Sequence, residues 1–225
     1  KLQDAELFTR KAIQLNPNLA EAHSNLGNIL RDLGKLHDAE LSTRKAIQLN
    51  PDYANAYSSL GSILRDQGNC KEAEIAYRKA IELNPDSAVA HSNLGTILRD
   101  LGKLKEAEKS TRKAIELKPT LVEAHSNLGN VLGDLGKLQD AQLSYQNAIK
   151  LKPDFAEAYY HLGNVLRGLG DFGDAINHFK EALKLNNQLS MAKAALIETK
   201  GNICDWSDQD IQTIWLKNLG IEGSS

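Results

Sequence analysis

Asparagines recur at one position of a repeating sequence pattern. Asn25, Asn93 and Asn127 each follow a serine and precede a Leu-Gly pair. A carboxamide has one acceptor and two donors, so a row of asparagines can hydrogen-bond the backbone of a peptide without reading its side chains. Ser59 and His161 interrupt the row. The alternative is that these asparagines are solvated or bridge neighbouring helices.

Arginines form a second row. Arg31, Arg65 and Arg99 recur at the same interval, and an aspartate follows each of them directly. Guanidinium groups could select acidic peptide segments through charge-assisted hydrogen bonds. The alternative is that each arginine pairs with a neighbouring aspartate on a solvated face, where such pairs contribute little.

Histidines also recur, at His23, His91 and His125. Metal ligands lie about 2 Å from their ion, and residues one repeat apart are too distant to share one. Tyr57 and Tyr159 occupy the same position in other repeats, so we expect these histidines to pack in the core. We predict no metal site.

The chain contains no motif for catalysis. It has no nucleophile–base pair, phosphate-binding glycine loop or metal-ligand cluster, so we predict no catalytic residue, no cofactor and no enzymatic activity of its own. Cys70 and Cys204 form no CxxC pair, so neither a disulfide framework nor a zinc site is indicated.

The composition and net charge limit the classes of partner that the chain is expected to bind. The chain is 41% hydrophobic and 25% charged, close to the average of globular proteins. A formal net charge of -2 gives no general attraction to nucleic acid or anionic membranes. No apolar stretch approaches the roughly 20 residues needed to span a bilayer. We therefore expect a cytoplasmic chain whose partners are proteins or peptides, not nucleic acid or membranes.

The elements that position these rows repeat every 34 residues. Each unit carries a Leu-Gly pair, then a glycine, then two alanines, and four of the five close on a proline. The units begin at Ala20, Ala54, Ala88, Val122 and Ala156. The spacing and these residues resemble the tetratricopeptide repeat family. Each unit is then a pair of helices, and Gly34, Gly68, Gly102, Gly136 and Gly170 end the first helices.

The resemblance implies an all-α fold, a right-handed superhelical solenoid of antiparallel helix pairs. We expect residues 1–19 to form the second helix of a truncated repeat, because they match only that half. Five units follow over residues 20–189, namely 20–53, 54–87, 88–121, 122–155 and 156–189. Residues 190–220 should form a capping helix and a short C-terminal helix, with a tail at 221–225. We expect Asp52, Asp86 or Asp154 to start the helix after each proline.

Two further expectations concern individual positions. In the capping helix, the apolar pattern predicts that Met191, Ala194, Ala195 and Ile197 cover the last repeat. In the family, the first helices line the concave face, so polar residues such as Ser24 should lie there. The candidate peptide-binding residues are Asn25, Asn28, Arg31, Arg65, Asn93, Arg99, Asn127, Asn130 and Asn164.

The stretch Cys204–Asp208, reading Cys-Asp-Trp-Ser-Asp, resembles the junction at which O-linked N-acetylglucosamine transferases pass from repeats into their catalytic region. Three hypotheses follow. The first is a non-catalytic scaffold that binds extended peptides on the concave face. The second is the substrate-recognition arm of such a glycosyltransferase. The third is a self-associating solenoid that stacks through apolar surface on its N-terminal helix.

Overall fold

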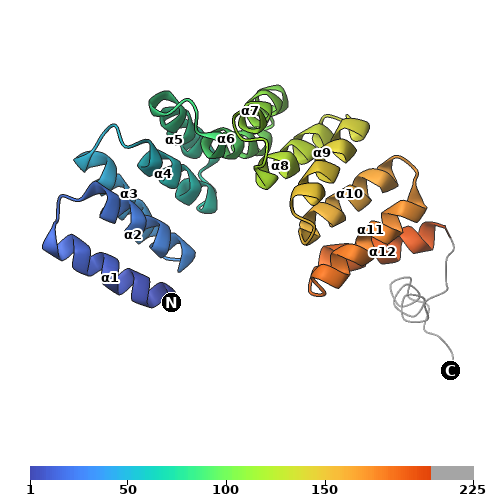
Figure 1. Cartoon of the computed structure of the whole chain (residues 1–225), viewed down its shortest axis with the longest axis horizontal. Helices are drawn as coiled ribbons and strands as arrows, with labels where there is room; N and C mark the ends of the chain where they lie inside the picture. The colour runs from blue at the N-terminus through green and yellow to red at the C-terminus, as the bar shows by residue number, and fades with distance from the viewer. Residues whose placement is uncertain (204–225) are drawn as a thin grey trace. The chain divides into compact units, whose positions relative to one another are not determined.

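The computed structural model describes residues 1–203, and these residues form helices with no strand among them (Figure 1). The first helices of the five repeats are α2 (Ala20–Asp32), α4 (Ala54–Asp66), α6 (Ala88–Asp100), α8 (Val122–Asp134) and α10 (Ala156–Gly168). The second helices are α1 (Leu2–Leu15), α3 (Leu36–Leu49), α5 (Cys70–Leu83), α7 (Leu104–Leu117), α9 (Leu138–Leu151) and α11 (Phe172–Leu185). A last helix, α12, spans Ser190–Asn202. The short helix expected after Ser207 lies outside the described residues.

The chain divides into two compact units, Lys1–Ala124 and His125–Ser225. In the first, α2, α4 and α6 each pack between the second helix of their own repeat and that of the repeat before. In the second, α10 packs between α9 and α11, and α12 packs on α11. The predicted all-α fold of stacked helix pairs is confirmed.

Glycine ends each first helix in the predicted way. Gly34 has a φ of 75°, in the left-handed region that glycine adopts without steric cost. Its N–H donates to the Arg31 carbonyl at 2.9 Å, and the Lys35 N–H donates to the Leu30 carbonyl at 2.8 Å. These two bonds satisfy carbonyls that the helix end leaves free. The other four turn glycines also have positive φ.

The turn after each second helix differs from the prediction. Helix α4 begins at Ala54 with Tyr53 as its N-cap, so Asp52 does not start it. The Asp52 N–H instead donates to Asn50 Oδ1 at 3.1 Å, an Asx turn that bridges the proline. Before α6 the cap is Ser87, whose hydroxyl accepts from the Ala90 N–H at 3.3 Å.

The core is aliphatic and depends on close helix approach. Leu26 and Leu30 of α2 pack with Ala39 of α3 and Ile63 of α4, all nearly inaccessible. Burying one such leucine stabilises the fold by about 1.5–3 kcal/mol. Small residues at the crossings allow the helices to come this close.

One core position differs in size between repeats. Opposite the Leu-Gly glycine of each first helix, the second helix places Thr43, Tyr77, Thr111, Tyr145 and Phe179 in turn. The threonine hydroxyl donates back to its own helix, as Thr43 Oγ1 does to the Ala39 carbonyl at 2.9 Å. Tyr77 is fully buried and its hydroxyl lies 2.9 Å from Ser62 Oγ. Burial raises the pKa of this phenol.

Helix α12 covers the last repeat with a different face from the predicted one. Ala195 and Ile197 are buried as expected, but Met191 and Ala194 are exposed. The buried residues are Ala192, Ala195, Leu196, Ile197, Thr199 and Lys200. Thr199 satisfies its hydroxyl by donating to the Ala195 carbonyl at 2.6 Å, which lets a polar residue face the core.

Carboxylates link consecutive repeats in the first unit. Glu6 of α1 binds Lys35 Nζ at 2.8 Å, and Glu74 of α5 binds Lys103 Nζ at 2.8 Å. Glu40 of α3 accepts instead from Gln67 Nε2 at 3.0 Å. The hydrogen bonds from Lys103 and Arg78 hold the pKa of Glu74 below its usual value of 4.5. Similar contacts lower the pKa of Glu6 and of Glu40.

These links make the fold sensitive to acid. A carboxyl whose pKa is lower in the folded state contributes stability that is complete above its ordinary pKa and is lost as the pH falls through the folded value. We expect the urea midpoint to fall as the pH is lowered past the ordinary carboxyl pKa of 4.5. Glu74→Gln should lower the midpoint at neutral pH and flatten this dependence.

The control for this prediction is Glu82→Gln. Glu82 is an exposed residue that pairs with Lys79 within the same helix, so its removal should leave the acid dependence as in the wild type. A Glu74→Gln profile parallel to that of the wild type below pH 5 would show that the link between repeats does not carry the effect.

Candidate functional site

The carboxamides of the first unit project without intramolecular partners. Asn25 on α2 is exposed, while Asn28 on α2 and Asn93 on α6 are half-buried. Within residues 1–203 none of the three side chains makes a hydrogen bond or ion pair. No buried side-chain nitrogen or oxygen is left unsatisfied there either, so these amides reach solvent. They are available to a ligand.

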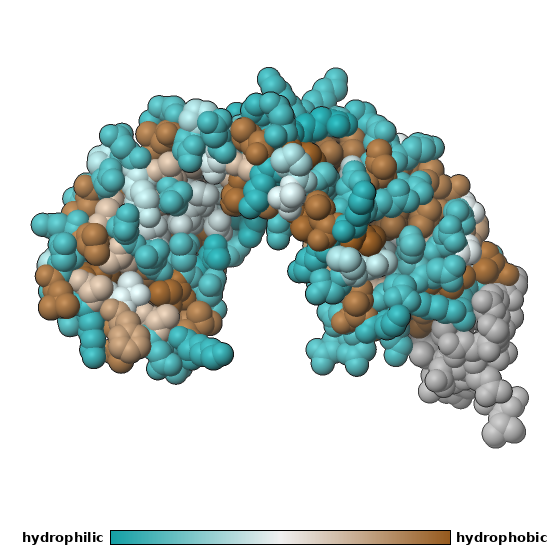
Figure 2. All heavy atoms as spheres, in the orientation of Figure 1, coloured by the Kyte–Doolittle hydropathy of each residue, from teal (hydrophilic) through white to brown (hydrophobic). Residues whose placement is uncertain are grey.

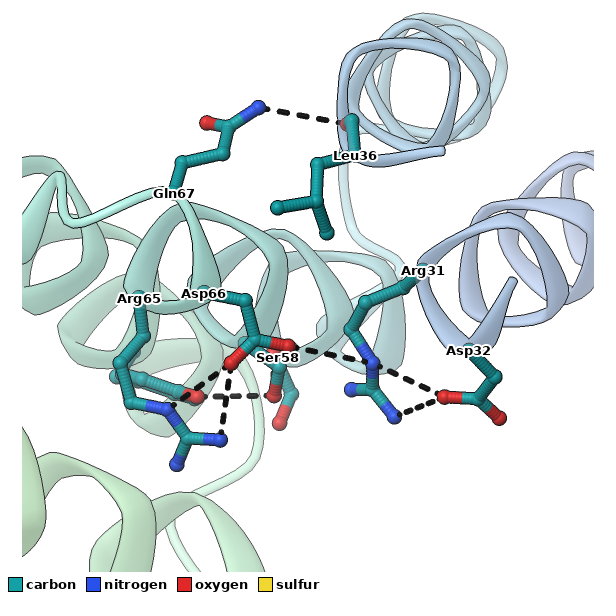
Figure 3. A network of polar contacts seen from close by, with 9 residues as sticks. Arg31, Asp32, Leu36, Ser58, Arg65, Asp66 and Gln67 are labelled. Atoms are coloured by element: carbon teal, nitrogen blue, oxygen red, sulfur yellow. Dashed lines mark hydrogen bonds and ion pairs between the residues drawn. The ribbon is translucent and has the colours of Figure 1, made fainter. Parts of the chain in front are cut away.

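The arginine row of the same unit is already paired (Figure 3). Arg31 Nη2 lies 2.9 Å from Asp32 Oδ1, and Arg31 Nε lies 3.7 Å from Asp66 Oδ2. Arg65 Nη2 contacts the other oxygen of Asp66 at 3.2 Å. Asp66 therefore joins an arginine of α2 to one of α4. Farther along, Arg99 Nη2 lies 3.4 Å from Asp100 Oδ1.

This pairing favours the second interpretation of the arginine row, in which each arginine pairs with a neighbouring aspartate on a solvated face. Each guanidinium is neutralised by an aspartate of its own or the next repeat, and an acidic ligand would have to displace that aspartate. The arginines are also about one-third exposed, where single ion pairs are worth about 0–1 kcal/mol. Their main effect is to order the polar face between neighbouring first helices.

In the second unit, two candidate asparagines are engaged. Asn130 Oδ1 accepts from the Tyr145 hydroxyl at 2.7 Å, and Asn164 Oδ1 accepts from Arg167 Nη2 at 3.2 Å. Asn127 is half-buried and also has an interaction. The structure thus separates the candidates into three unengaged carboxamides in the first unit and three engaged ones in the second.

Two assignments from the sequence were wrong. Ser24 and the equivalent Ser92 are only 2% and 3% exposed, so they belong to the packing surface and not to an open face. His23 and His91 are half-exposed, not core residues. His23 Nε2 lies 2.9 Å from the Pro17 carbonyl. His91 bonds the equivalent Pro85 carbonyl at 3.0 Å.

Two features escaped the sequence reasoning. The first is a cluster of aromatic rings around Tyr160 and His161 in the second unit. Its signal was the replacement of Ser-Asn by Tyr-His. The second is a groove of about 710 Å³ between α5 and α7, floored by Leu94 and Leu98 of α6. It lies on the opposite face of α6 from Asn93, and the Arg78–Glu106 ion pair links the two helices beside it.

Among residues 1–203, no group of histidine, cysteine, aspartate and glutamate side chains is arranged to hold a metal ion. In the same residues, no helix has the length and apolar character that a membrane span requires. Helix α1 does expose apolar side chains, including Phe8 at 66% and Leu15 at 89%. Brown and tan side chains over α1 mark this surface in Figure 2.

The chain is similar to several solved structures. A protein described as YrrB, a TPR protein with an unusual peptide-binding site, is 26% identical over 83% of this chain and 96% of its own, with a TM-score of 0.62. MamA is 26% identical over 73% of this chain and 96% of its own, with a TM-score of 0.63. PilF of Pseudomonas aeruginosa, at 21% identity, covers 89% and 91% with a TM-score of 0.78 and supports the fold alone.

No curated protein matches the chain in a sequence comparison. Two tetratricopeptide repeat profiles match it, one over residues 18–86 and 52–120 and the other over residues 126–190. Together they span the region in which the helix pairs recur, and this repeat is in general a protein-interaction scaffold. On the repeats, the helix pairs and these matches, the chain belongs to the tetratricopeptide repeat family.

Proposed function

We propose that the chain is a non-catalytic scaffold that binds extended peptide segments on the face of the first helices. The observation that carries this proposal is the set of unengaged carboxamides at Asn25, Asn28 and Asn93, beside arginines that are paired. An extended peptide has a free N–H and C=O at every residue. A carboxamide can donate to one and accept from the other.

The spacing of the repeats fits such a ligand. First helices that pack side by side lie about 8–10 Å apart, and an extended peptide advances about 3.3 Å per residue. Equivalent positions on successive first helices would therefore meet about every third peptide residue, so Asn25 and Asn93, which are two repeats apart, would meet about every sixth. Recognition through the backbone makes binding tolerant of peptide sequence. The likeness to a solved TPR protein with a peptide-binding site supports the same proposal.

The test is a triple variant, Asn25→Ala, Asn28→Ala and Asn93→Ala, assayed against a labelled library of unstructured peptides. Each lost hydrogen bond should cost about 0.5–1.5 kcal/mol, so we expect the averaged affinity to fall at least tenfold. Fluorescence anisotropy measures the affinity, and circular dichroism checks that helicity is unchanged.

The matched control removes three carboxamides from second helices. Gln14, Gln48 and Gln146 are exposed on α1, α3 and α9, and changing all three to alanine should leave peptide binding intact. Equal binding by the asparagine variant and the wild type, or no binding by either, would exclude the asparagine row as a peptide site.

The two other hypotheses remain predictions. The glycosyltransferase arm depends on Cys204–Asp208, which lie outside the described residues. Self-association through α1 is consistent with the exposure of Phe8 and Leu15.

A further inference from the structure

The first helix of the fifth repeat departs from the others at two adjacent positions. Tyr160 and His161 stand where the first, third and fourth repeats carry Ser-Asn, and the second carries Ser-Ser. The chain is poor in aromatic residues, at 5%. Their concentration on one helix is therefore a local feature of this repeat and not a general property of the sequence.

Side-chain length distinguishes Tyr160 at a position that is covered in three of the other four repeats. Three of the serines at this position are buried, with 2% exposed at Ser24, 3% at Ser92 and 6% at Ser126, while Ser58 of the second repeat is half-buried. A serine side chain is short enough to stay beneath the atoms that bury this position. Tyr160 is half-buried, because its longer side chain extends past the cover toward the surface. Its ring centroid lies 6.2 Å from that of Phe179 and 5.0 Å from that of His161.

Buried aromatic rings support Tyr160 and His161. His161 stacks on Tyr145 with 5.6 Å between ring centroids and 13° between ring planes. Tyr145 is 3% exposed and its hydroxyl donates to Asn130 Oδ1 at 2.7 Å. Phe179 is fully buried. The rotamers of the two half-exposed rings are thus restrained before any ligand arrives, which lowers the entropy cost of binding.

Polar donors lie on the same side of the helix. Asn164 follows Tyr160 by four residues and His161 by three, so all three side chains share one face of α10. The Asn164 carbonyl oxygen accepts from Arg167, and its amide nitrogen still carries two N–H donors. The Tyr160 hydroxyl is a further donor. The subsite therefore combines aromatic surface with groups that donate hydrogen bonds.

We propose that Tyr160 and His161, with Asn164, form a subsite for a proline-containing extended segment of a bound peptide. A polyproline II segment makes no internal hydrogen bonds, so its carbonyl oxygens are free to accept from such donors. Its pyrrolidine rings pack on aromatic surfaces with little loss of conformational freedom. This proposal rests on the proposed peptide binding and adds a side-chain preference to it.

The experiment uses the full 225-residue chain and three labelled peptides of equal length in the same glycine–serine host. The first carries Pro-Ala-Pro at its centre, the second Ala-Ala-Ala and the third Ala-Phe-Ala. Anisotropy titrations should show the proline peptide binding about tenfold more tightly than the alanine peptide. The double variant Tyr160→Ser/His161→Asn, which installs the residues of the first, third and fourth repeats, should bind the proline and alanine peptides equally.

Two single variants guard against a change in folding. Tyr160→Phe keeps the ring and removes the hydroxyl, so it should keep part of the preference, and His161→Asn should lose part of it. Equal affinity of the wild type for the proline and alanine peptides overturns the subsite alone. So does tightest binding of the phenylalanine peptide. Failure of the wild type to bind any of the three overturns the subsite and the proposed peptide binding together.

Discussion

Replacing Gly27 by alanine is expected to lower the free energy of unfolding by about 3 kcal/mol, because overpacking a close crossing forces the helices apart. A Cβ at Gly27 would lie 2.0 Å from Thr43 Oγ1 and 3.1 Å from the Ala39 carbonyl oxygen. Thr43 cannot turn away freely, since it is fully buried and its hydroxyl is bonded to Ala39. Urea unfolding followed by circular dichroism measures the loss.

Gly133 provides the matched control for Gly27. It also lies inside a first helix, α8, but a Cβ there would meet no atom within 4 Å. Alanine favours a helix over glycine by about 1 kcal/mol, so Gly133→Ala should stabilise the chain slightly. The same substitution is thus predicted to change the free energy of unfolding in opposite directions at two glycines that both lie in first helices.

A double variant locates the cause of the Gly27 effect. Thr43→Ala removes the hydroxyl that the new methyl group would strike, so Gly27→Ala should cost less in the Thr43→Ala background. The two changes should deviate from additivity by about 1 kcal/mol or more. Additive costs would mean that contact with Thr43 is not the source of the destabilisation.

The 34-residue period was enough to predict the helix pairs, because close helix crossings and left-handed turns restrict residue choice locally. Gly34 and the other turn glycines have the expected positive φ, and the alanines Ala39 and Ala46 are fully buried. These positions depend on backbone geometry within one repeat. A pattern read from one repeat therefore transfers to the next.

The errors concern side chains whose environment is set by residues outside the pattern. His23 was expected in the core, but its ring reaches a proline carbonyl six residues earlier. Ser24 looks polar in sequence and is covered by packing. On α12, the residues of α11 decide which face is buried, and the helix itself has a weak apolar pattern. Met191 could not be assigned to solvent from its sequence position.

The candidate site was predictable only in part for the same reason. The asparagine and arginine rows are visible as spacing, but the spacing does not show which side chains are engaged. Asn130 is bonded by Tyr145, which comes from the following helix. The repeat of the equivalent Asn28 carries Thr43 in place of this tyrosine, and the Thr43 hydroxyl donates to its own helix backbone. The residue opposite the glycine thus affects whether the carboxamide nearby stays free.

Replacing Tyr77 by threonine, the residue that the first and third repeats carry, is expected to destabilise the first unit by about 3–4 kcal/mol. In the first and third repeats the helices pack closely against the threonine. A Cβ at Gly27 would lie 2.0 Å from Thr43 Oγ1, and one at Gly95 would lie 2.3 Å from Thr111 Oγ1. The ring of Tyr77 would lie 2.8 Å from a Cβ at Gly61. A threonine at residue 77 would leave a cavity that the helices can collapse around only partly.

The hydrogen bond to Ser62 accounts for a minor share of this cost, and Tyr77→Phe separates the two contributions. It keeps the ring and removes the hydroxyl, which should cost about 1 kcal/mol, because Ser62 Oγ can still donate to the Ser58 carbonyl at 3.2 Å. Repeats in a solenoid are stabilised mainly by their nearest neighbours. Amide exchange should therefore accelerate most in α4, α5 and α6 of the Tyr77→Thr variant, and much less in α10 and α11. Uniform acceleration along the whole chain would show that the repeats unfold as one cooperative block.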